Sequence, residues 1–202
     1  MNAVFQAGGK TLKSAFEKKV NENEKNPLIS IPAEGSLRSK AIYFVPWKPS
    51  SDQNSLCQSI EQLVENVIKR AASEKFQTIA FPAIGCGEYG CPIDLIAKTF
   101  VSHCQQLLTK YSVSVVFVIQ PEKTEIYHNF QRYIDSSKHR QTTVKEPPIS
   151  LRIGNGMIEV KKGDITQQQV TISLVLNQFL IFLIRLTLSL VAHHQKICDK
   201  FY

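Results

Sequence analysis

Three glycines close together follow a short apolar run near the middle of the chain. The run 78–81 has the length and composition of a buried strand, and Gly85, Gly87 and Gly90 come shortly after it. Pro92 then opens a stretch with helical spacing of apolar residues, and proline is favoured in the first turn of a helix. Glycine lets a backbone approach an anion closely, while the amides and the dipole of a helix start favour negative charge. The pattern therefore predicts a loop that holds a phosphate or a diphosphate.

The same loop also contains two side chains that are able to react. Cys86 lies between the first two glycines, and Glu88 is the only carboxylate of the loop. A nucleophilic cysteine needs an activating base, and no histidine is placed by the sequence beside Cys86. His103 and His128 fall on predicted helices, where surface or core roles are expected. We therefore predict no catalytic residue, with Cys86 as a small loop residue and Glu88 as a solvated one.

The cysteine pattern argues against a disulfide framework and against a metal centre. The chain has five cysteines, an odd number, and none of them forms a CxxC pair, which favours a reducing compartment. Cys198 with His193 and His194 is the one group with metal-binding residue types, and at a chain end it is expected to be incidental. The sequence predicts neither a metal nor a cofactor.

The charge favours anionic partners. The formal net charge is +7 and the pI is about 9.2. Basic residues gather between 10 and 19 and again between 138 and 145. Solvated basic faces and contact with RNA or another polyanion are both open interpretations.

Strands and helices alternate around the glycine loop. Apolar runs predict strands at 28–31, 41–45, 78–81 and 113–119, and helical spacing predicts helices at 3–20, 55–72, 92–108 and 121–134. Gly8 and Gly9 are expected to kink the first helix or delay its start. The alternation indicates an α/β layered domain with a largely parallel sheet. Ligands of such sheets bind beyond the carboxyl ends of the strands, where the glycine loop falls.

The last third of the chain has a different organisation. Residues 137–148 are polar, basic and proline-containing, which predicts a linker. Two short strands at 149–153 and 157–161 are joined by a Gly-Asn-Gly turn, a hairpin signal. Residues 170–192 are long and apolar enough to be considered as a membrane span, but Arg185 near the centre makes insertion only marginal. The alternative is a segment outside its proper fold context, and no N-terminal signal peptide is expected because Met1 leads into a polar helix.

Three stretches resemble the macrodomain, a module that binds ADP-ribose. They are 31–37 (IPAEGSL), 40–45 (KAIYFV) and, the most specific, 79–87 (IAFPAIGCG). The resemblance covers about 1–136 and is closest to the tandem macrodomains of mono-ADP-ribosylating members of the poly(ADP-ribose) polymerase family. It implies a three-layer α/β/α fold with a mixed central sheet.

A second, partial match follows the linker at 157–166 (MIEVKKGDIT). In the family, the Asp of the Gly-Asp-Ile-Thr motif binds the adenine amino group, with the amide of the next residue close by. The resemblance thus implies a site built from both parts of the chain, with Tyr89 packing either on a ribose or over the core. The implied ligand-binding residues are Ala83, Ile84, Gly85, Cys86, Gly87, Glu88, Tyr89, Gly90, Asp164 and Ile165.

The sequence also departs from the family pattern. A complete macrodomain opens with two strands and an Asn- and Gly-rich first diphosphate loop, whereas this chain starts at about the first helix. We therefore expect an N-terminally truncated macrodomain at 1–136, the start of a second at 149–169 and a divergent tail at 170–202. Two outcomes are open. Either the first part folds incompletely with a loosely attached tail, or 149–175 docks where the opening strands are missing and completes the sheet in permuted order.

The resemblance predicts binding of ADP-ribose or ADP-ribosylated proteins, in the nucleus or cytoplasm and in the setting of ADP-ribosylation and transcription regulation. The alternatives are an ADP-ribosyl hydrolase and a basic module for RNA or poly(ADP-ribose). Binding is favoured over catalysis, because the first diphosphate loop needed for hydrolysis and the transferase domain are both missing from the pattern.

Overall fold

A single mixed sheet contains all the strands in the described part of the chain, which a computed structural model gives as residues 2–22, 28–136 and 149–176. Its strands are β1 (Ile29–Pro32), β2 (Ala41–Val45), β3 (Thr78–Pro82), β4 (Ser114–Ile119), β5 (Ile149–Ile153), β6 (Gly156–Lys162) and β7 (Ile172–Leu176). They lie in the order β1-β2-β7-β3-β4-β6-β5. The inner neighbours run parallel, and the edge pairs β1–β2 and β5–β6 run antiparallel.

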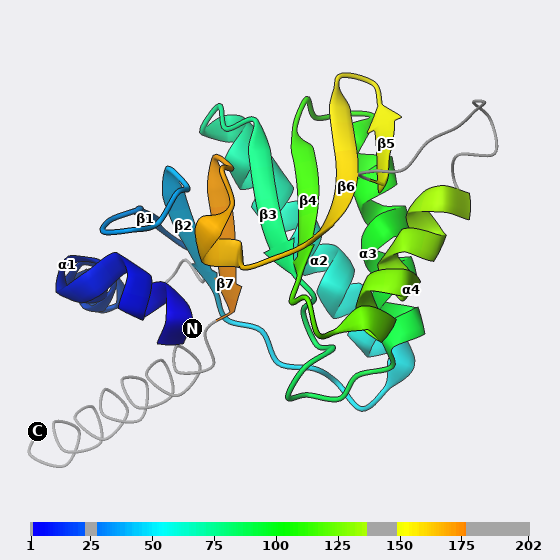
Figure 1. Cartoon of the computed structure of the whole chain (residues 1–202), viewed down its shortest axis with the longest axis horizontal. Helices are drawn as coiled ribbons and strands as arrows, with labels where there is room; N and C mark the ends of the chain where they lie inside the picture. Colours follow the sequence, from blue (N-terminus) through cyan, green and yellow to red (C-terminus); the bar gives the residue numbers. More distant parts are fainter. Residues whose placement is uncertain (1, 23–27, 137–148, 177–202) are drawn as a thin grey trace, which may run out of the picture.

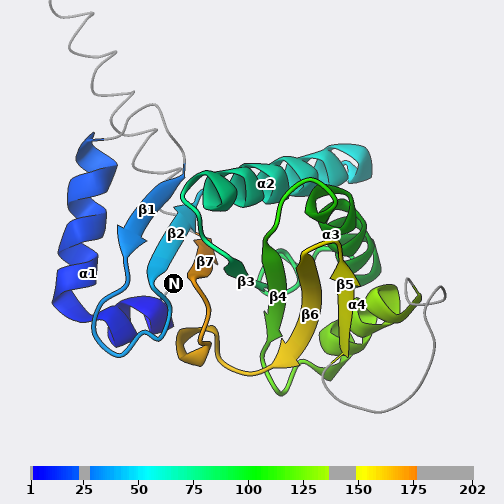
Figure 2. The same ribbon diagram turned by 90° about the horizontal axis from the view of Figure 1, so that it is seen from above.

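Helices cover both faces of this sheet (Figures 1 and 2). They are α1 (Asn2–Glu22), α2 (Gln53–Ser73), α3 (Ile93–Leu108), α4 (Thr124–Ser136) and the short 3-10 helix η1 (Ile165–Gln167). The buried faces of α2, α3 and α4 share one large core with the sheet, whereas α1 packs over β1 and β2 in a second cluster. The three-layer α/β fold implied by the sequence is thus confirmed.

Local signals account for where the helices begin and bend. Asp52 caps α2, since its carboxylate accepts a hydrogen bond from the amide of Ser55 at 2.7 Å. Gly9 has a φ of 69° and marks the expected kink within α1. Pro92 stands just before α3, with Asp94 in the first turn, where a negative charge is favoured.

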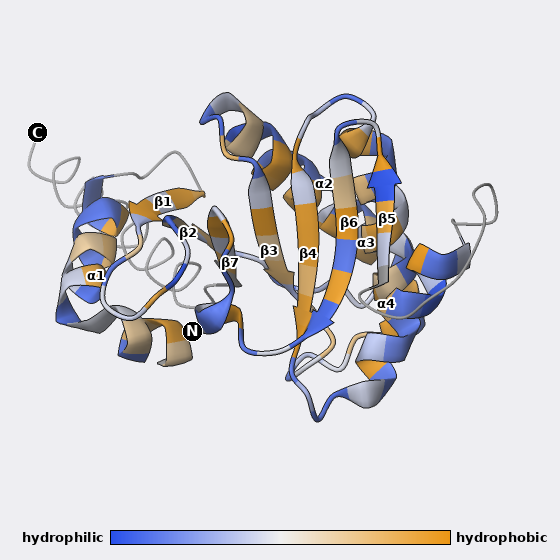
Figure 3. Cartoon of the chain, turned by 45° about the horizontal axis from the view of Figure 1, so that its top comes forward, coloured by the Kyte–Doolittle hydropathy of each residue, from blue (hydrophilic) through white to orange (hydrophobic). Residues whose placement is uncertain are grey.

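The main core is aromatic at its centre. The rings of Phe81, Phe100, Phe117 and Phe130 come from β3, α3, β4 and α4, and all four are fully buried. Neighbouring centroids in this group lie 4.7 to 6.3 Å apart. Figure 3 shows the apolar central strands running between more polar outer helices. The glycine loop therefore follows β3, a strand whose side chains are packed on both faces of the sheet.

The C-terminal strands join the sheet formed by the first part of the chain, with β7 inside it and β6 and β5 at one edge. β6 pairs with β4 over five registered positions, and β7 lies between β2 and β3 (Figure 1). Of the two outcomes left open by the sequence, this is the second, in which the C-terminal strands dock and complete the sheet in permuted order. The physical reason is that Ile158, Val160, Ile172 and Leu174 fill the common core, and each is at most 1% exposed.

The predicted hairpin is confirmed, with Ile153 registered opposite Gly156. Gly156 has to be glycine because an added Cβ would lie 2.2 Å from the carbonyl oxygen of Val113. The sequence assigned residues 170–202 to a divergent tail. Part of that range instead forms β7, because its apolar residues pair with β2 and β3. The linker 137–148 and the segment 177–202 lie outside the described residues. Among the helices that the structure describes, none is long and apolar enough to cross a membrane.

Candidate functional site

The glycine loop connects the carboxyl end of β3 to the start of α3. Pro82, the last residue of β3, is registered opposite Val118 of β4, and β4 in turn pairs with β6. The parallel strands place the loop at the same edge as the end of β6. This is the edge at which α/β sheets bind their ligands.

Short hydrogen bonds within the loop define its shape. The amide of Cys86 donates to the carbonyl of Ala83 at 3.2 Å, and that of Gly90 donates to Gly87 at 3.0 Å. The amide of Cys91 closes the loop on the carbonyl of Gly85 at 3.0 Å. Within the described residues, the amides of Gly87 and Glu88 have no such acceptor. The loop therefore presents two adjacent amides on a fixed backbone, which is an arrangement suited to an anion.

Two of the glycines have separate roles. Gly85 has a φ of 82°, and a Cβ at this position would lie 3.1 Å from the Trp47 ring and 3.2 Å from the sulfur of Cys91. Gly87 has no atom within 4 Å of its added Cβ and is exposed. Gly85 is thus needed for the turn itself, while Gly87 keeps the approach to the loop open.

The side chains of the loop that seemed reactive have different environments. Cys86 is 9% exposed and lies in the main core, where burial raises the pKa of its thiol from 9.0 to about 12. The nearby Cys91 thiol adds to this rise, and its own pKa is also raised by burial. Glu88 is exposed to solvent. A thiol with so high a pKa is a poor nucleophile, in agreement with the structural role expected for Cys86.

Tyr89 contacts the protein through both its ring and its hydroxyl. Its ring meets Trp47 edge-on with a centroid distance of 5.6 Å, and its hydroxyl donates to the Trp47 carbonyl at 3.4 Å. Tyr89 packs against the main core with Ala83, while Ile84 is buried in it. This geometry favours the core-capping role for Tyr89 over packing on a ribose.

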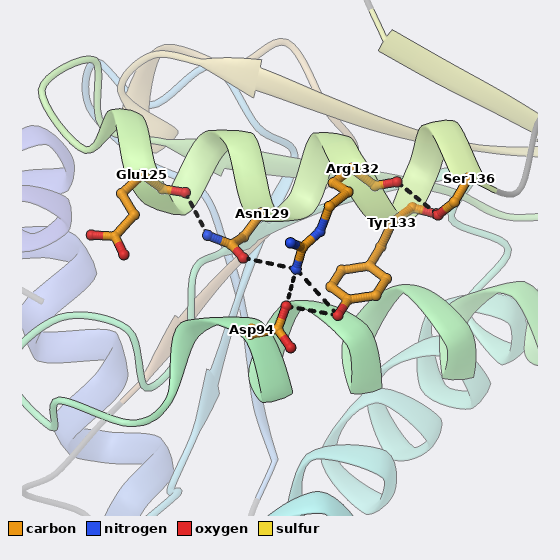
Figure 4. A network of polar contacts seen from close by, with 6 residues as sticks. All are labelled: Asp94, Glu125, Asn129, Arg132, Tyr133 and Ser136. Carbon is orange, nitrogen blue, oxygen red and sulfur yellow. Dashed lines mark hydrogen bonds and ion pairs between the residues drawn. The ribbon is translucent and has the colours of Figure 1, made fainter.

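The start of α3, directly after the loop, is fixed by contacts with α4. Figure 4 shows Asp94 on the first turn of α3 facing Arg132 and Tyr133 of α4. Arg132 forms an ion pair with Asp94, and the Tyr133 hydroxyl donates to the same carboxylate at 2.7 Å. Asn129 adds an acceptor for Arg132 at 3.3 Å. These exposed contacts hold the helix whose N-terminus follows the glycine loop.

Asp164 and Ile165 lie on the connection between β6 and β7. The amide of Gly163 donates to the last carbonyl of β4, that of Ile119, at 2.8 Å, so this connection begins at the loop's edge of the sheet. The Asp164 side chain is exposed and accepts from the amide of Thr166 at 2.8 Å. Ile165 packs against the two smaller apolar clusters of the second face.

The two parts of the expected site therefore share one edge of the sheet. β3 carries the loop and β6 leads to Asp164, with only β4 between them, so the two strands are about 10 Å apart. β7 is registered with β3 only at Ile172 and Ser173, although it follows β2 over five positions. The β3–β7 ladder thus ends before the carboxyl edge, next to the loop.

Trp47 is a residue of this site that sequence reasoning missed. It follows β2 at the same edge, is 5% exposed and contacts both Gly85 and Tyr89. A signal was present, since Trp47 is the only tryptophan and stands between Pro46 and Pro49 after a buried strand.

The two histidines among the described residues lie on helices and not in the loop. His128 on α4 is exposed and contacts Gln131, and His103 on α3 is half-buried. No group of three metal-binding side chains occurs among the residues that the structure describes. The candidate cluster of Cys198, His193 and His194 is outside them.

Comparison with known families matches residues 1–100 to the Macro domain. Among curated proteins, the chain is 28% identical over 130 residues to the O-acetyl-ADP-ribose deacetylase of Salmonella typhimurium, covering 60% of this chain and 71% of the relative. The protein of the same name from Citrobacter koseri is 27% identical over 129 residues, covering 60% and 72%.

Solved structures with the same fold include the Oceanobacillus iheyensis macrodomain. One variant of it, solved with ADPR, has a TM-score of 0.59 at 23% identity, covering 68% of this chain and 76% of that one. The same macrodomain solved with ADP has a TM-score of 0.57 at 21% identity, covering 69% and 76%. At this identity the likeness concerns the fold alone.

Proposed function

Because residues 1–100 match the Macro domain and the fold is that of a macrodomain, we propose that this chain binds ADP-ribose through the backbone of its glycine loop. The observation that carries the proposal is the pair of adjacent amides at Gly87 and Glu88, which have no acceptor within the described residues. They lie on a loop between the end of β3 and the start of α3. A diphosphate placed there would accept hydrogen bonds from neutral donors that are already in position.

Asp164 is the second element of the proposed site. Its exposed carboxylate keeps one oxygen on the amide of Thr166, which fixes its orientation at the edge shared with the loop. A carboxylate accepts hydrogen bonds from an amino group such as that of adenine. The nucleotide end of the ligand would then lie toward β6, with its diphosphate at the loop.

The first prediction concerns Gly87, where an added side chain meets open space. We expect Gly87→Trp to lower the affinity for ADP-ribose at least about tenfold, or about 1.4 kcal/mol, because the indole occupies the approach to the amides. Gly87→Ala is the matched control and should have a smaller effect. Isothermal titration calorimetry measures both, and the thermal unfolding midpoint should be unchanged in each. The absence of binding by the unmodified chain at millimolar ADP-ribose would refute the proposal.

We propose that the partner is an ADP-ribosylated protein. The chain would bind it as part of a larger protein related to the poly(ADP-ribose) polymerase family. This is supported by the motif at 79–87 and the second motif at 157–166 occurring in one chain. A defined protein carrying one ADP-ribose should bind the chain, and its unmodified form should not. Equal binding of the two forms in surface plasmon resonance would contradict this assignment.

A second candidate function is hydrolysis of an ADP-ribose ester, which is favoured by the names of the deacetylase relatives. The described loop gives it less support. Cys86 is buried with a high thiol pKa, and Glu88 is exposed. Release of acetate from O-acetyl-ADP-ribose, lost in Gly87→Trp, would move the assignment from binding to catalysis.

A further inference from the structure

The glycine loop is held from one side by a single residue of another loop. Trp47 follows the carboxyl end of β2 and is 5% exposed. Its ring edge lies 3.1 Å from where a Cβ of Gly85 would be, and its centroid is 5.6 Å from that of Tyr89. Its backbone carbonyl also accepts the Tyr89 hydroxyl at 3.4 Å. Trp47 therefore contacts both ends of the segment 85–89.

The two amides proposed for the diphosphate lie between these contacts. Gly87 and Glu88 are both exposed, and Gly87 has no side chain that could hold the backbone in place. Their position is therefore set by the residues on either side. Gly85 lies against the edge of the Trp47 ring, and the ring of Tyr89 packs nearly perpendicular to that of Trp47.

Trp47 is in turn held by α2. Its indole nitrogen donates to the hydroxyl of Ser59 at 3.2 Å, and that hydroxyl donates to the carbonyl of Leu56 at 2.7 Å. Both partners are on the first turns of α2, whose buried face belongs to the main core. The ring orientation of Trp47 is thus fixed by a rigid element rather than by the loop that it contacts.

We propose that Trp47 is a positioning residue that keeps the glycine loop in its anion-binding conformation. This inference rests on the proposed function for its consequence in binding. An apparent dissociation constant equals the intrinsic one divided by the fraction of molecules in the competent conformation. A loop that is competent in about one molecule in ten would therefore bind ADP-ribose about tenfold more weakly.

The test uses the full chain and its Trp47→Phe variant, in which a smaller ring no longer reaches Gly85 or Ser59. Phe130→Leu is the matched control, because Phe130 is fully buried in the same core but lies on α4. The primary measurement is hydrogen–deuterium exchange of the amides of Cys86, Gly90 and Cys91 without ligand. We expect exchange about tenfold faster in Trp47→Phe and no change confined to the loop in Phe130→Leu.

The second measurement is the affinity for ADP-ribose by calorimetry, expected to fall about tenfold in Trp47→Phe and to be unchanged in Phe130→Leu. Unchanged loop exchange in Trp47→Phe would overturn the inference, and so would equal loosening of the loop in the control. If the unmodified chain does not bind ADP-ribose while its loop loosens in Trp47→Phe, the proposed function fails and the positioning role stands. If Trp47→Phe loosens the loop but binds normally, the link between loop order and affinity is wrong.

Discussion

At the scale of single residues, the loop exposes part of its backbone and packs several of its side chains in the core. Cys86, Ile84 and Cys91 are buried beneath it, and Gly87 and Glu88 face solvent. This division explains why reactive residue types in the loop do not signal catalysis. A thiol that packs in an apolar core is kept protonated by the same burial that anchors the loop.

The high pKa of the Cys86 thiol leads to a prediction on its reactivity. At pH 8, a rise from 9.0 to about 12 lowers the thiolate fraction about a thousandfold. We expect iodoacetamide to modify the half-buried Cys57 well before Cys86 in the folded chain, with peptide mapping by mass spectrometry as the measurement. Denaturant should remove the difference. Equal labelling in the folded chain would show that the loop opens readily.

The same shift gives the direction of a pH effect. Because the folded-state pKa of Cys86 lies above the usual value, the protonated thiol is the form that folding favours. The contribution of the buried, protonated Cys86 thiol to the free energy of unfolding is therefore complete below pH 9. It is lost as the pH rises from 9 toward 12.

At the scale of elements, β7 is the strand that makes the sheet continuous. It is registered with β2 over five positions and joins β2 to β3, which do not pair with each other. Leu174 points into the main core, whereas the neighbouring Ser173 points to the opposite face with its hydroxyl buried and unpaired among the described residues. A strand in this position has to contribute to the stability of the whole domain.

Substitutions at these two neighbouring positions test the placement of β7. Leu174→Ala should lower the free energy of unfolding by about 2–5 kcal/mol, because it leaves a cavity in the core. Ser173→Ala is the matched control and should raise it by about 1 kcal/mol or leave it unchanged, since it removes a buried hydroxyl without a partner. Urea denaturation measures both. A neutral Leu174→Ala would mean that β7 does not occupy the centre of the sheet.

At the scale of the whole molecule, the proposed site is composite. The glycine loop comes from the first part of the chain and Asp164 from the last, and the sheet places them at one edge. The exposed lysines Lys10 and Lys13 lie instead on α1, which covers β1 and β2 (Figure 2). These two lysines therefore lie on a different element from the glycine loop and Asp164.

Recognition by neutral amides predicts how ADP-ribose binding responds to salt. Neutral amides release few counterions, so the slope of log affinity against log salt should be no steeper than about −1. A single-stranded polyanion such as RNA adds about 0.7 to the slope for each phosphate neutralised. Fluorescence anisotropy between 50 and 300 mM salt distinguishes the two, and a steep slope for ADP-ribose itself would argue against amide-based recognition.

Much of this fold follows from local patterns. Residues 41–45 form β2 as predicted, and 53–73 form α2 around the expected apolar face. Both could be predicted because a continuous apolar run or a helical spacing is a pattern of residues close together in the chain. The hairpin of β5 and β6 was also predictable from its Gly-Asn-Gly turn. The strand β7 was harder to identify, since an apolar run is compatible with a strand, a helix or a membrane span until its neighbours are known.

The sequence by itself determined the elements other than β7, as well as the glycine loop, since these depend on residues close together in the chain. Only the tertiary structure decided that β6 and β7 complete the sheet of the first part, because strand pairing depends on which edges are left open elsewhere in the molecule. It also decided that Trp47 supports the loop, a contact across 38 or more positions that no local pattern encodes. The loop by itself indicates a class of ligand, and the tertiary structure adds Asp164 and Trp47, the two residues that complete the site we propose.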